Sequence, residues 1–295
     1  TISRNGDLVH RMYLQLVTAG EDGENPGTGI IDYIECEIGG QRIDKHYGHW
    51  MEVWFELTEE NPYGFNGTGE NIDDTNGMDT NGTGATLSTK FQRMSAAGGV
   101  HNIGSTGLTS GAYFYVPLTF WFCRNPGLAL PLIALQYHEV KIKIALTTGV
   151  LKASSSLSLW ADYIYLDTDE RRRFAQVSHE YLIEQVQQQA FSQSTMTLTF
   201  NHPVKELVFV GSTGDSWTGD NFNSLEGTYQ LKLNGHDRFK ERDFTYFTRT
   251  QVWQHHTGYG GVSNKDSIGV YSFALKPEEH QPSGTCNFSR IDNAQ

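Results

Sequence analysis

The sequence of 295 residues predicts an all-β protein built from two antiparallel sandwiches. Three observations lead to this prediction. The chain has 31 Gly, 16 Phe, 14 Tyr and 6 Trp, while charged residues make up only 19%, a balance that favours strands over long helices. Short alternating apolar runs are separated by Gly, Pro and Asn turns. Several segments recur in the same order in the second half of the chain.

The first part of the chain contains two predicted strands and a returning edge. Leu8–Val17 alternates in polarity and follows an Asn-Gly turn, which is a strong hairpin signal. Ile30–Ile38 is a further strand, Gly39-Gly40 a tight turn and Gln41–His46 the returning strand. The pattern of Trp50–Leu57 fits a helix or a strand, and we favour a short helix that packs its Trp and Phe side chains on the sheet.

The longest apolar tract, Gly111–Leu146, is broken at Asn125-Pro126-Gly127 and again at Pro131. Proline in a helix interior removes a backbone donor, and a membrane span needs about 20 apolar residues, so the tract does not fit one membrane helix. It predicts a buried strand at Val116–Phe122, a turn with a short helical segment at Asn125–Ala134, and an alternating strand at Glu139–Leu146.

The tract from 59 to 112 is dominated by Asn, Gly, Thr and Asp and offers few side chains that could anchor a core. We expect either disorder or a long surface loop inserted into the first sandwich. Asn66 and Asn81 begin N-glycosylation triplets in this tract and are possible modification sites, and Asn287 begins a third triplet. Such triplets also arise by chance in an Asn-rich sequence.

The rest of the chain predicts a linker followed by a second series of strands. Leu157–Leu166 is a strand, Asp167–Gln176 a charged connection, and the Gln-rich Tyr181–Gln193 a linker with room for one helical turn. The run Arg171-Arg172-Arg173 is interpreted as a solvated strand end, with contact to a neighbouring subunit as the alternative. The later strands are expected at Thr195–Phe200, Val204–Gly211, Thr228–Leu233, Phe239–Thr248 and Ile268–Leu275.

An internal repeat relates the two halves. It pairs Asn5–Leu14 with Asn201–Val210, Ile38–Ile43 with Leu233–Phe239, and Tyr115–Phe120 with Val270–Leu275. The offset is about 195 residues for the first two pairs and about 40 less for the third, as expected if the first copy carries the Asn/Gly-rich insertion. Two similar all-β modules with long loops favour a pair of jelly rolls.

This repeat predicts the domain organisation. The first jelly roll covers 1–175 with its loop insertion at 59–112, a linker covers 176–190, and the second jelly roll covers 191–295. The second copy stops where the first still has two strands to come. We therefore expect a double jelly roll that is incomplete at both ends of this sequence.

The net charge argues against one class of partner, and the cysteines indicate the redox state of the compartment. The formal net charge is −12, and a surface poor in cations argues against direct nucleic-acid binding, which needs Lys and Arg on phosphates. Cys36, Cys123 and Cys286 have no CxxC spacing and fit a reducing compartment rather than a disulfide framework. No signal peptide or membrane span is visible in the sequence.

The search for catalytic chemistry yields little. The acid/base or metal-like clusters are His46-Tyr-Gly-His49, His138-Glu139, His179-Glu180, His255-His256 and Glu278-Glu279-His280. None has the His-x-His, Glu and downstream His arrangement that a metal site inside a jelly roll needs. We interpret these histidines as hydrogen-bonded strand-end or subunit-contact residues, and predict no catalytic residue, no metal ligand, no cofactor and no enzymatic activity.

Five segments together resemble a known family: SRNGDLVHRMYLQL, IGGQRIDKHYGHW, FWFCRNPGLALPLIALQYHEVKI, FNHPVKEL and YSFALKPEEHQPSGTCNFSRIDN. In this order, they resemble the major capsid protein of the nucleocytoplasmic large DNA viruses, in particular its algal-virus and iridovirus-like members. The resemblance spans Ser3 to Asn293. It implies a double jelly-roll protomer and a homotrimer that is pseudo-hexagonal because each subunit supplies two sandwiches.

The resemblance also implies partners and a location. The trimers would tile an icosahedral virion shell over an internal membrane that the chain does not span, with minor capsid proteins beneath, after assembly in the host cytoplasm.

The alternative is a carbohydrate-binding β-sandwich protein, because Trp and Tyr on sandwiches also hold sugars. A glycosidase would need two carboxylates that face each other across a cleft, and Glu59-Glu60 and Glu278-Glu279 are adjacent pairs that point apart on a strand.

Overall fold

The computed structural model describes residues 1–17, 26–60, 89–95, 113–147, 155–190, 194–212, 222–260 and 266–295. These residues form two compact units. The first unit contains the described residues up to Glu52, the pair 94–95, and those from 113 to Val186. The second contains the described residues from Val53 to Arg93 and from Gln187 onward, so the boundary falls inside a helix, α2 (Gly48–Thr58).

One sheet of the first unit is organised around β1 (Leu8–Val17), as predicted. It pairs antiparallel with β4 (Tyr113–Pro117), with β5 (Leu130–Pro131) and with β7 (Ser156–Ile164), which confirms the strand predicted at Leu157–Leu166. Burial alternates along β1 from Arg11 onward, so one face of this sheet points into the core.

A second sheet in the same unit has β2 (Ile31–Ile38) at its centre, between β3 (Gln41–Tyr47) and β6 (Val140–Leu146). All three strands confirm the sequence prediction. Gly39 and Gly40 connect β2 to β3 with φ values of 60° and 86°. Because side chains other than Gly, Asn and Asp rarely adopt such values, the Gly-Gly pair determines where this hairpin turns.

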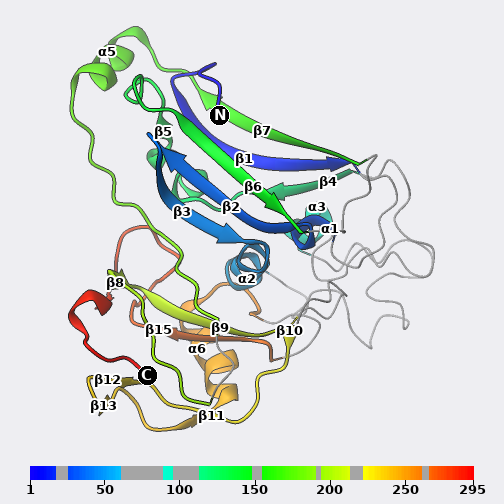
Figure 1. Cartoon of the computed structure of the whole chain (residues 1–295), viewed down its shortest axis with the longest axis vertical. Coiled ribbons are helices and arrows are strands. Elements are labelled where there is room, and N and C mark those ends of the chain that lie inside the picture. The colour runs from blue at the N-terminus through cyan, green and yellow to red at the C-terminus, as the bar shows by residue number, and fades with distance from the viewer. Residues whose placement is uncertain are drawn as a thin grey trace. The chain divides into compact units, whose positions relative to one another are not determined.

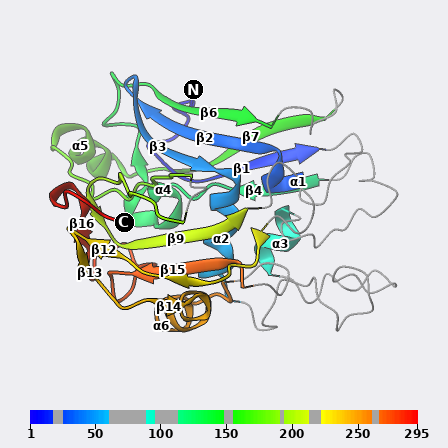
Figure 2. The ribbon, with the colours of Figure 1, turned by 60° about the horizontal axis from the view of Figure 1, so that its bottom comes forward.

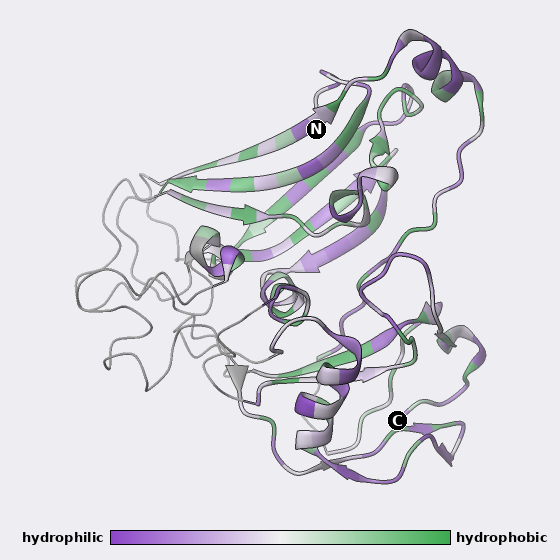
Figure 3. Ribbon diagram, turned by 180° about the vertical axis from the view of Figure 1, so that it is seen from behind, coloured by the Kyte–Doolittle hydropathy of each residue, from purple (hydrophilic) through white to green (hydrophobic). Residues whose placement is uncertain are grey.

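The two sheets lie as separate layers in the first unit, one with β7, β1 and β4 and the other with β6, β2 and β3 (Figure 1). Apolar and polar residues alternate along the strands (Figure 3). The inward side chains of both sheets join one buried cluster, which includes Met12, Leu14, Ile34, Val116 and Phe122. The first unit is therefore a β-sandwich.

The strand predicted at Val116–Phe122 is wrong beyond its second residue. β4 ends at Pro117, and a helical turn, α4 (Trp121–Arg124), follows. A helical turn brings consecutive side chains into the core, where Trp121, Phe122 and Cys123 are buried, whereas a strand would expose every second one. The next turn is as predicted: η3 (Pro126–Leu128) begins after Asn125, whose side chain accepts a hydrogen bond from the Gly127 amide (2.9 Å).

The charged connection predicted at Asp167–Gln176 is a helix, α5 (Thr168–Gln176). Asp169 and Glu170 lie in its first turn and Arg173 in its last, which suits the helix dipole. The arginines are exposed, as interpreted, but they lie in this helix and not at a strand end. Arg171 reaches back to Asp7 (Nη2 to Oδ2, 2.9 Å), so it attaches α5 to the start of the first sheet.

After α5 the chain runs without helix or strand through residues 177–190, so the helical turn allowed for the linker is absent from its described part. In the second unit, Gln187 and Gln189 pair with backbone groups instead. The Gln187 amide donates to the Asn201 carbonyl (3.1 Å) and accepts from its N–H (2.9 Å). Gln189 does the same with the Thr197 carbonyl (2.8 Å) and the Thr199 N–H (3.0 Å).

These glutamines occupy the backbone groups that a neighbouring strand would use. The strand predicted at Thr195–Phe200 is consequently wrong, since this stretch has no strand pairing in the structure. Gln185, which belongs to the first unit, donates similarly to the Ile43 carbonyl.

The second unit has shorter strands. Its main sheet pairs β9 (Glu206–Ser212) with β15 (Ile268–Ser272) and β10 (Phe222–Asn223). Strands β9 and β15 lie side by side in Figure 2. This confirms the strands predicted at Val204–Gly211 and Ile268–Leu275, with the latter ending three residues early. Three two-stranded ladders accompany it: β8 (Pro203–Val204) with β16 (Cys286–Asn287), β11 (Thr228–Tyr229) with β14 (Arg242–Asp243), and β12 (Lys232–Leu233) with β13 (His236–Asp237).

Aromatic side chains fill the interior of the second unit around Phe247, which is 1% exposed. Its ring centroid lies 5.7 Å from that of Phe209, 5.9 Å from Tyr229 and 5.4 Å from Phe239. The strand predicted at Phe239–Thr248 is mostly wrong. Phe247 belongs to the π-helical turn η4 (Tyr246–Thr250), which continues into α6 (Gln251–His255).

Three short helices and a turn complete the described chain. α1 (Pro26–Gly29) precedes β2, α2 confirms the helix predicted at Trp50–Leu57, and η5 (Phe288–Arg290) follows β16. α3 (Lys90–Ser95) lies within the tract 59–112, for which we expected few core anchors and either disorder or a surface loop, and for this part the expectation is wrong. Phe91 is 2% exposed and stacks on Phe55 with centroids 4.1 Å apart. No helix among the described residues is long and apolar enough to cross a membrane.

Candidate functional site

Two of the predicted histidine clusters become buried polar networks, one in each unit. In the first, His46 lies on β3 with its ring between Asp44 and Thr119. Nε2 is 2.8 Å from Asp44 Oδ2, and Nδ1 is 3.1 Å from Thr119 Oγ1. The ring also stacks on Phe120 at 4.6 Å between centroids. Asp44 Oδ1 accepts a hydrogen bond from the Val186 amide (3.1 Å), which fastens the extended segment after α5 to β3.

An Asp–His–Thr series has the connectivity of a nucleophilic triad. Here the side chains of His46 and Asp44 are only 3% and 1% exposed, and Thr119 is buried as well. A substrate cannot reach the Thr119 hydroxyl through the packed core. The network therefore positions β3 inside the sandwich, and it has no access for chemistry.

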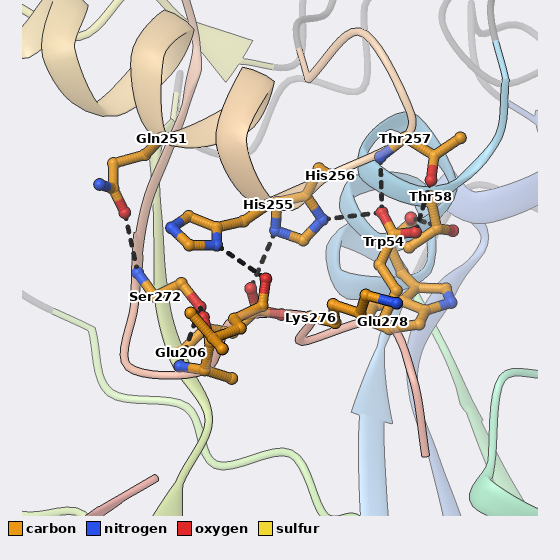
Figure 4. Close-up of polar contacts among 12 residues, drawn as sticks. Trp54, Thr58, Glu206, Gln251, His255, His256, Thr257, Ser272, Lys276 and Glu278 are labelled. Carbon is orange, nitrogen blue, oxygen red and sulfur yellow. Dashed lines mark hydrogen bonds and ion pairs between the residues drawn. The ribbon is translucent and has the colours of Figure 1, made fainter. Parts of the chain in front are cut away.

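The second network surrounds His256, directly after α6 (Figure 4). Its Nε2 lies 2.9 Å from Glu206 Oε2 on β9, and its Nδ1 lies 3.0 Å from Glu278 Oε1. Glu278 also accepts hydrogen bonds from Thr257, at 2.8 Å from the amide and 2.7 Å from the hydroxyl. The His256 side chain is fully buried, and that of Glu206 is 10% exposed.

The two carboxylates determine the charge of His256. Burial alone would lower the pKa of His256, but the hydrogen bonds and charges of Glu206 and Glu278 outweigh it and raise this pKa to about 9. Burial likewise favours the neutral form of Glu278, yet the hydrogen bonds from His256 and Thr257 keep the pKa of Glu278 below its usual value. At neutral pH the network is an imidazolium between two carboxylates.

This arrangement has no open position for a substrate or a metal ion. Both ring nitrogens of His256 carry a proton that a carboxylate accepts, so neither can ligate a metal or act as a base. Across the described parts of the chain, no group of three or more His, Cys, Asp and Glu side chains could hold a metal ion.

The other predicted clusters remain separate. His179 stacks on Phe174 with centroids 4.9 Å apart, and its Nε2 lies 2.8 Å from the Phe174 carbonyl. Glu139 pairs with Lys141 (2.9 Å) at the start of β6. Glu278 and Glu279 point apart as expected, because Glu279 pairs with Lys276 (2.9 Å) instead of facing the His256 network.

Of the three N-glycosylation triplets, only the one at Asn287 lies among the described residues. Asn66 and Asn81 lie outside the described residues and stay predictions. Asn287 serves a structural purpose: its Oδ1 accepts from the Ser289 amide (3.1 Å) and opens η5. The hydroxyl of Ser289, the third residue of this triplet, accepts from the His202 amide (2.8 Å).

The outward faces of the two sheets in the first unit differ in their side chains. The outward face of the β4–β1–β7 sheet carries four aromatic side chains among polar ones such as Gln15 and Ser158. Tyr13 lies opposite Trp160, and Tyr115 contacts Tyr13 edge-on at 6.0 Å between centroids. Trp160 is 51% exposed and Tyr113, further along β4, is 58% exposed. We call Tyr13, Tyr113, Tyr115 and Trp160 the aromatic face.

The outward face of the β3–β2–β6 sheet is ionic. Glu35 lies 3.3 Å from Arg42 and 3.9 Å from Lys45, and Glu37 pairs with Lys143. Paired charges remain well solvated and resist association, whereas exposed aromatic side chains are enriched where proteins bind each other. The aromatic face is therefore the candidate interaction surface of this unit.

Sequence reasoning missed these partnerships, although part of the signal was present. Asp44 and His46 are two residues apart on a strand and so share a face, and the alternation of Tyr113 and Tyr115 places both on one side. The pairing of His256 with Glu206 and Glu278 joins residues 50 and 22 positions away, and no local pattern reports it.

Comparison with known proteins identifies the family. Residues 1–167 match the family described as major capsid protein N-terminus, and residues 170–295 match the large eukaryotic DNA virus major capsid protein family. The chain belongs to the major capsid proteins of large eukaryotic DNA viruses. Within this capsid family, the major capsid protein of Pyramimonas orientalis virus is 45% identical over 99% of this chain and 76% of its own length.

Solved structures in the capsid family agree. A subunit of the PBCV-1 virus capsid matches with a TM-score of 0.73 and 35% identity, over 99% of this chain and 77% of that one. The Faustovirus major capsid protein matches with a TM-score of 0.57 at 13% identity, over 100% of this chain and 82% of that one, and this likeness concerns the fold. The predicted all-β double jelly roll and the resemblance to the capsid family are both confirmed.

Proposed function

We propose that this chain is the repeating structural subunit of an icosahedral virion shell, in which three copies form a pseudo-hexagonal capsomer. The observation that carries the proposal is the match over 99% of the chain to a subunit of an assembled virus capsid. Each chain supplies two similar sandwiches, so a trimer contains six of them and has a nearly hexagonal outline. Heterologous contacts between the three copies close the ring.

Within this proposal, the aromatic face meets a neighbouring copy. Obligate interfaces are rich in Tyr and Trp, and the exposed Trp160 and Tyr113 of the aromatic face fit this composition better than the ion pairs of the β3–β2–β6 face. The neighbouring capsomers of the shell are further copies of the same chain.

We further propose what lies around the shell and where it assembles. Minor capsid proteins would bind beneath the shell, an internal membrane would lie close without being spanned, and assembly would take place in the host cytoplasm. No catalytic role is included, because the two histidine networks have no accessible nucleophile or open ligand position.

Sedimentation velocity with negative-stain electron microscopy tests the proposal on the full-length protein. We expect a stable trimer that forms pseudo-hexagonal particles or extended arrays. A protein that stays monomeric up to tens of micromolar and binds an oligosaccharide array would overturn it in favour of a carbohydrate-binding sandwich.

A further inference from the structure

The residues Ala274–Ser283, which we call the 274–283 corner, connect β15 to the strand β16 and fold back over the second unit. Several contacts attach this corner to other elements, among them those with the residues at the end of α6. Glu278 binds His256 and Thr257 just after α6, and the Leu275 carbonyl lies 3.1 Å from His255 Nδ1. His256 in turn binds Glu206 on β9, so one buried ring joins three segments that are distant in sequence (Figure 4).

We propose that His256 is a pH-operated latch that ties the 274–283 corner to β9 and to the end of α6, and that loss of its proton frees the corner. This inference goes beyond the capsid function and does not depend on it.

The geometry explains why one proton controls the latch. The imidazolium has two N–H donors, and each points at a carboxylate, 2.9 Å from Glu206 and 3.0 Å from Glu278. A neutral imidazole has one donor and one lone pair. Deprotonation therefore leaves a lone pair facing a carboxylate at contact distance and two like charges without a cation between them, around a fully buried ring.

The two lysines closest in sequence to the latch carboxylates are engaged elsewhere. Lys205, next to Glu206, directs its Nζ to the Glu279 carbonyl (2.6 Å), and Lys276 pairs with the Glu279 carboxylate (2.9 Å). Neither lysine therefore replaces the imidazolium between Glu206 and Glu278.

Among the described residues, neither α6 nor α2 adds a second cation to the latch. α6 contributes His255, whose Nδ1 faces the Leu275 carbonyl. α2 presents Trp54 and Thr58 beside Glu278, neither of which titrates, and its buried Glu56 accepts a hydrogen bond from Gln92 (2.8 Å). His256 is thus the cation that both latch carboxylates share.

The direction of the pH effect follows from linkage. The pKa of His256 is raised in the folded state, from an ordinary value of 6.5 to about 9. Its contribution to holding the corner is fully present below about pH 6.5 and is lost progressively as the pH rises to about 9. Glu278 has a lowered pKa, so its contribution is present above its ordinary value and is lost in acid. The corner is held best between these limits.

Hydrogen–deuterium exchange of peptides that span the corner, corrected for intrinsic rates, tests the latch on the full-length protein between pH 6 and 10. We expect the protection of the corner to fall by about two to three orders of magnitude across this interval. His256→Gln, which stays neutral, should show low protection at pH 6 and little further change. A wild-type protein whose corner protection stays constant from pH 6.5 to 9.5 would overturn the proposal.

His255→Gln is the matched control, since His255 contacts the same corner from the adjacent position. It should lower protection equally at every pH and keep the wild-type slope. If His256→Gln does not fold, Glu206→Gln serves instead: His256 then has one carboxylate partner, so the fall in protection should begin at a lower pH and be smaller. An unchanged profile in Glu206→Gln would also contradict the latch.

Discussion

Tyr13 of β1 and Trp160 of β7 lie directly opposite each other on the outward face of the first sheet, while Leu14, next to Tyr13, is buried on the inward face. Strand alternation thus separates contacts that could serve assembly from contacts that hold the sandwich together. Substitutions on the two faces should consequently have different effects.

Trp160→Ala should weaken association between copies at least tenfold and change the free energy of unfolding by less than about 1 kcal/mol, because the side chain is half exposed. Sedimentation velocity and thermal unfolding measure the two effects. Leu14→Ala is the opposite-face control and should cost about 2–5 kcal/mol of stability. If Trp160→Ala associates as strongly as the wild type, the aromatic face does not lie in the interface.

Asp44→Ala should destabilise the protein by about 3 kcal/mol, measured by urea unfolding. The substitution leaves His46 and the Val186 amide without their buried acceptor. Asp32→Ala, at an exposed position of β2, is the comparison and should stay within about 0.5 kcal/mol of wild type. Equal losses in the two variants would mean that the buried network contributes nothing specific.

Asp7 should give the protein part of its acid sensitivity. A hydrogen bond from the Leu166 amide and an ion pair with Arg171 hold the pKa of Asp7 below its ordinary value. A lowered folded-state pKa contributes stability above the ordinary value of 3.8, and this contribution is lost as the pH falls through the folded-state value. Urea unfolding between pH 6 and 3 should therefore show a shallower decline for Asp7→Asn than for wild type.

Arg171→Gln should flatten the same decline in part, since it removes one of the two groups that favour the charged carboxylate. The double variant should then differ little from Asp7→Asn alone. Fully additive effects of the two substitutions would contradict a direct interaction.

The three cysteines should differ in reactivity. Burial raises the pKa of Cys36 and of Cys123 to about 12, so at pH 8 about one part in ten thousand of each is thiolate. Cys286 is only partly buried. Peptide mapping after timed iodoacetamide treatment should find Cys286 alkylated first and the other two only after unfolding. Early alkylation of Cys36 would show that the first sandwich opens readily.

Alternation of polarity predicted the strands of the first unit well, because each has one buried face. Leu8–Val17 and Glu139–Leu146 carry this signal in their own residues, and the Gly39-Gly40 turn carries its own backbone requirement. The second unit was harder, because most of its ladders are two residues long. A ladder of that length has no period from which to predict it.

The errors have physical causes that single segments do not reveal. α5 was missed because its residues are nearly all polar and give no apolar stripe, although its end charges suit a helix. The aromatic run around Phe247 fitted a strand, but the core takes these side chains from helical turns. His256 was grouped with its neighbour in sequence, whereas its partners come from β9 and the 274–283 corner.

The glutamines at positions 187 and 189 have a consequence for mutational tolerance. In an ordinary sheet the rungs of the ladder belong to the backbone, so almost any residue except proline leaves them intact. Here each rung to Asn201, Thr197 and Thr199 is a side-chain amide. A single change to Glu replaces the amide donor by an acceptor and removes one hydrogen bond. In this segment the pairing therefore depends on the identity of the side chain, whereas in a β-strand it depends on the backbone.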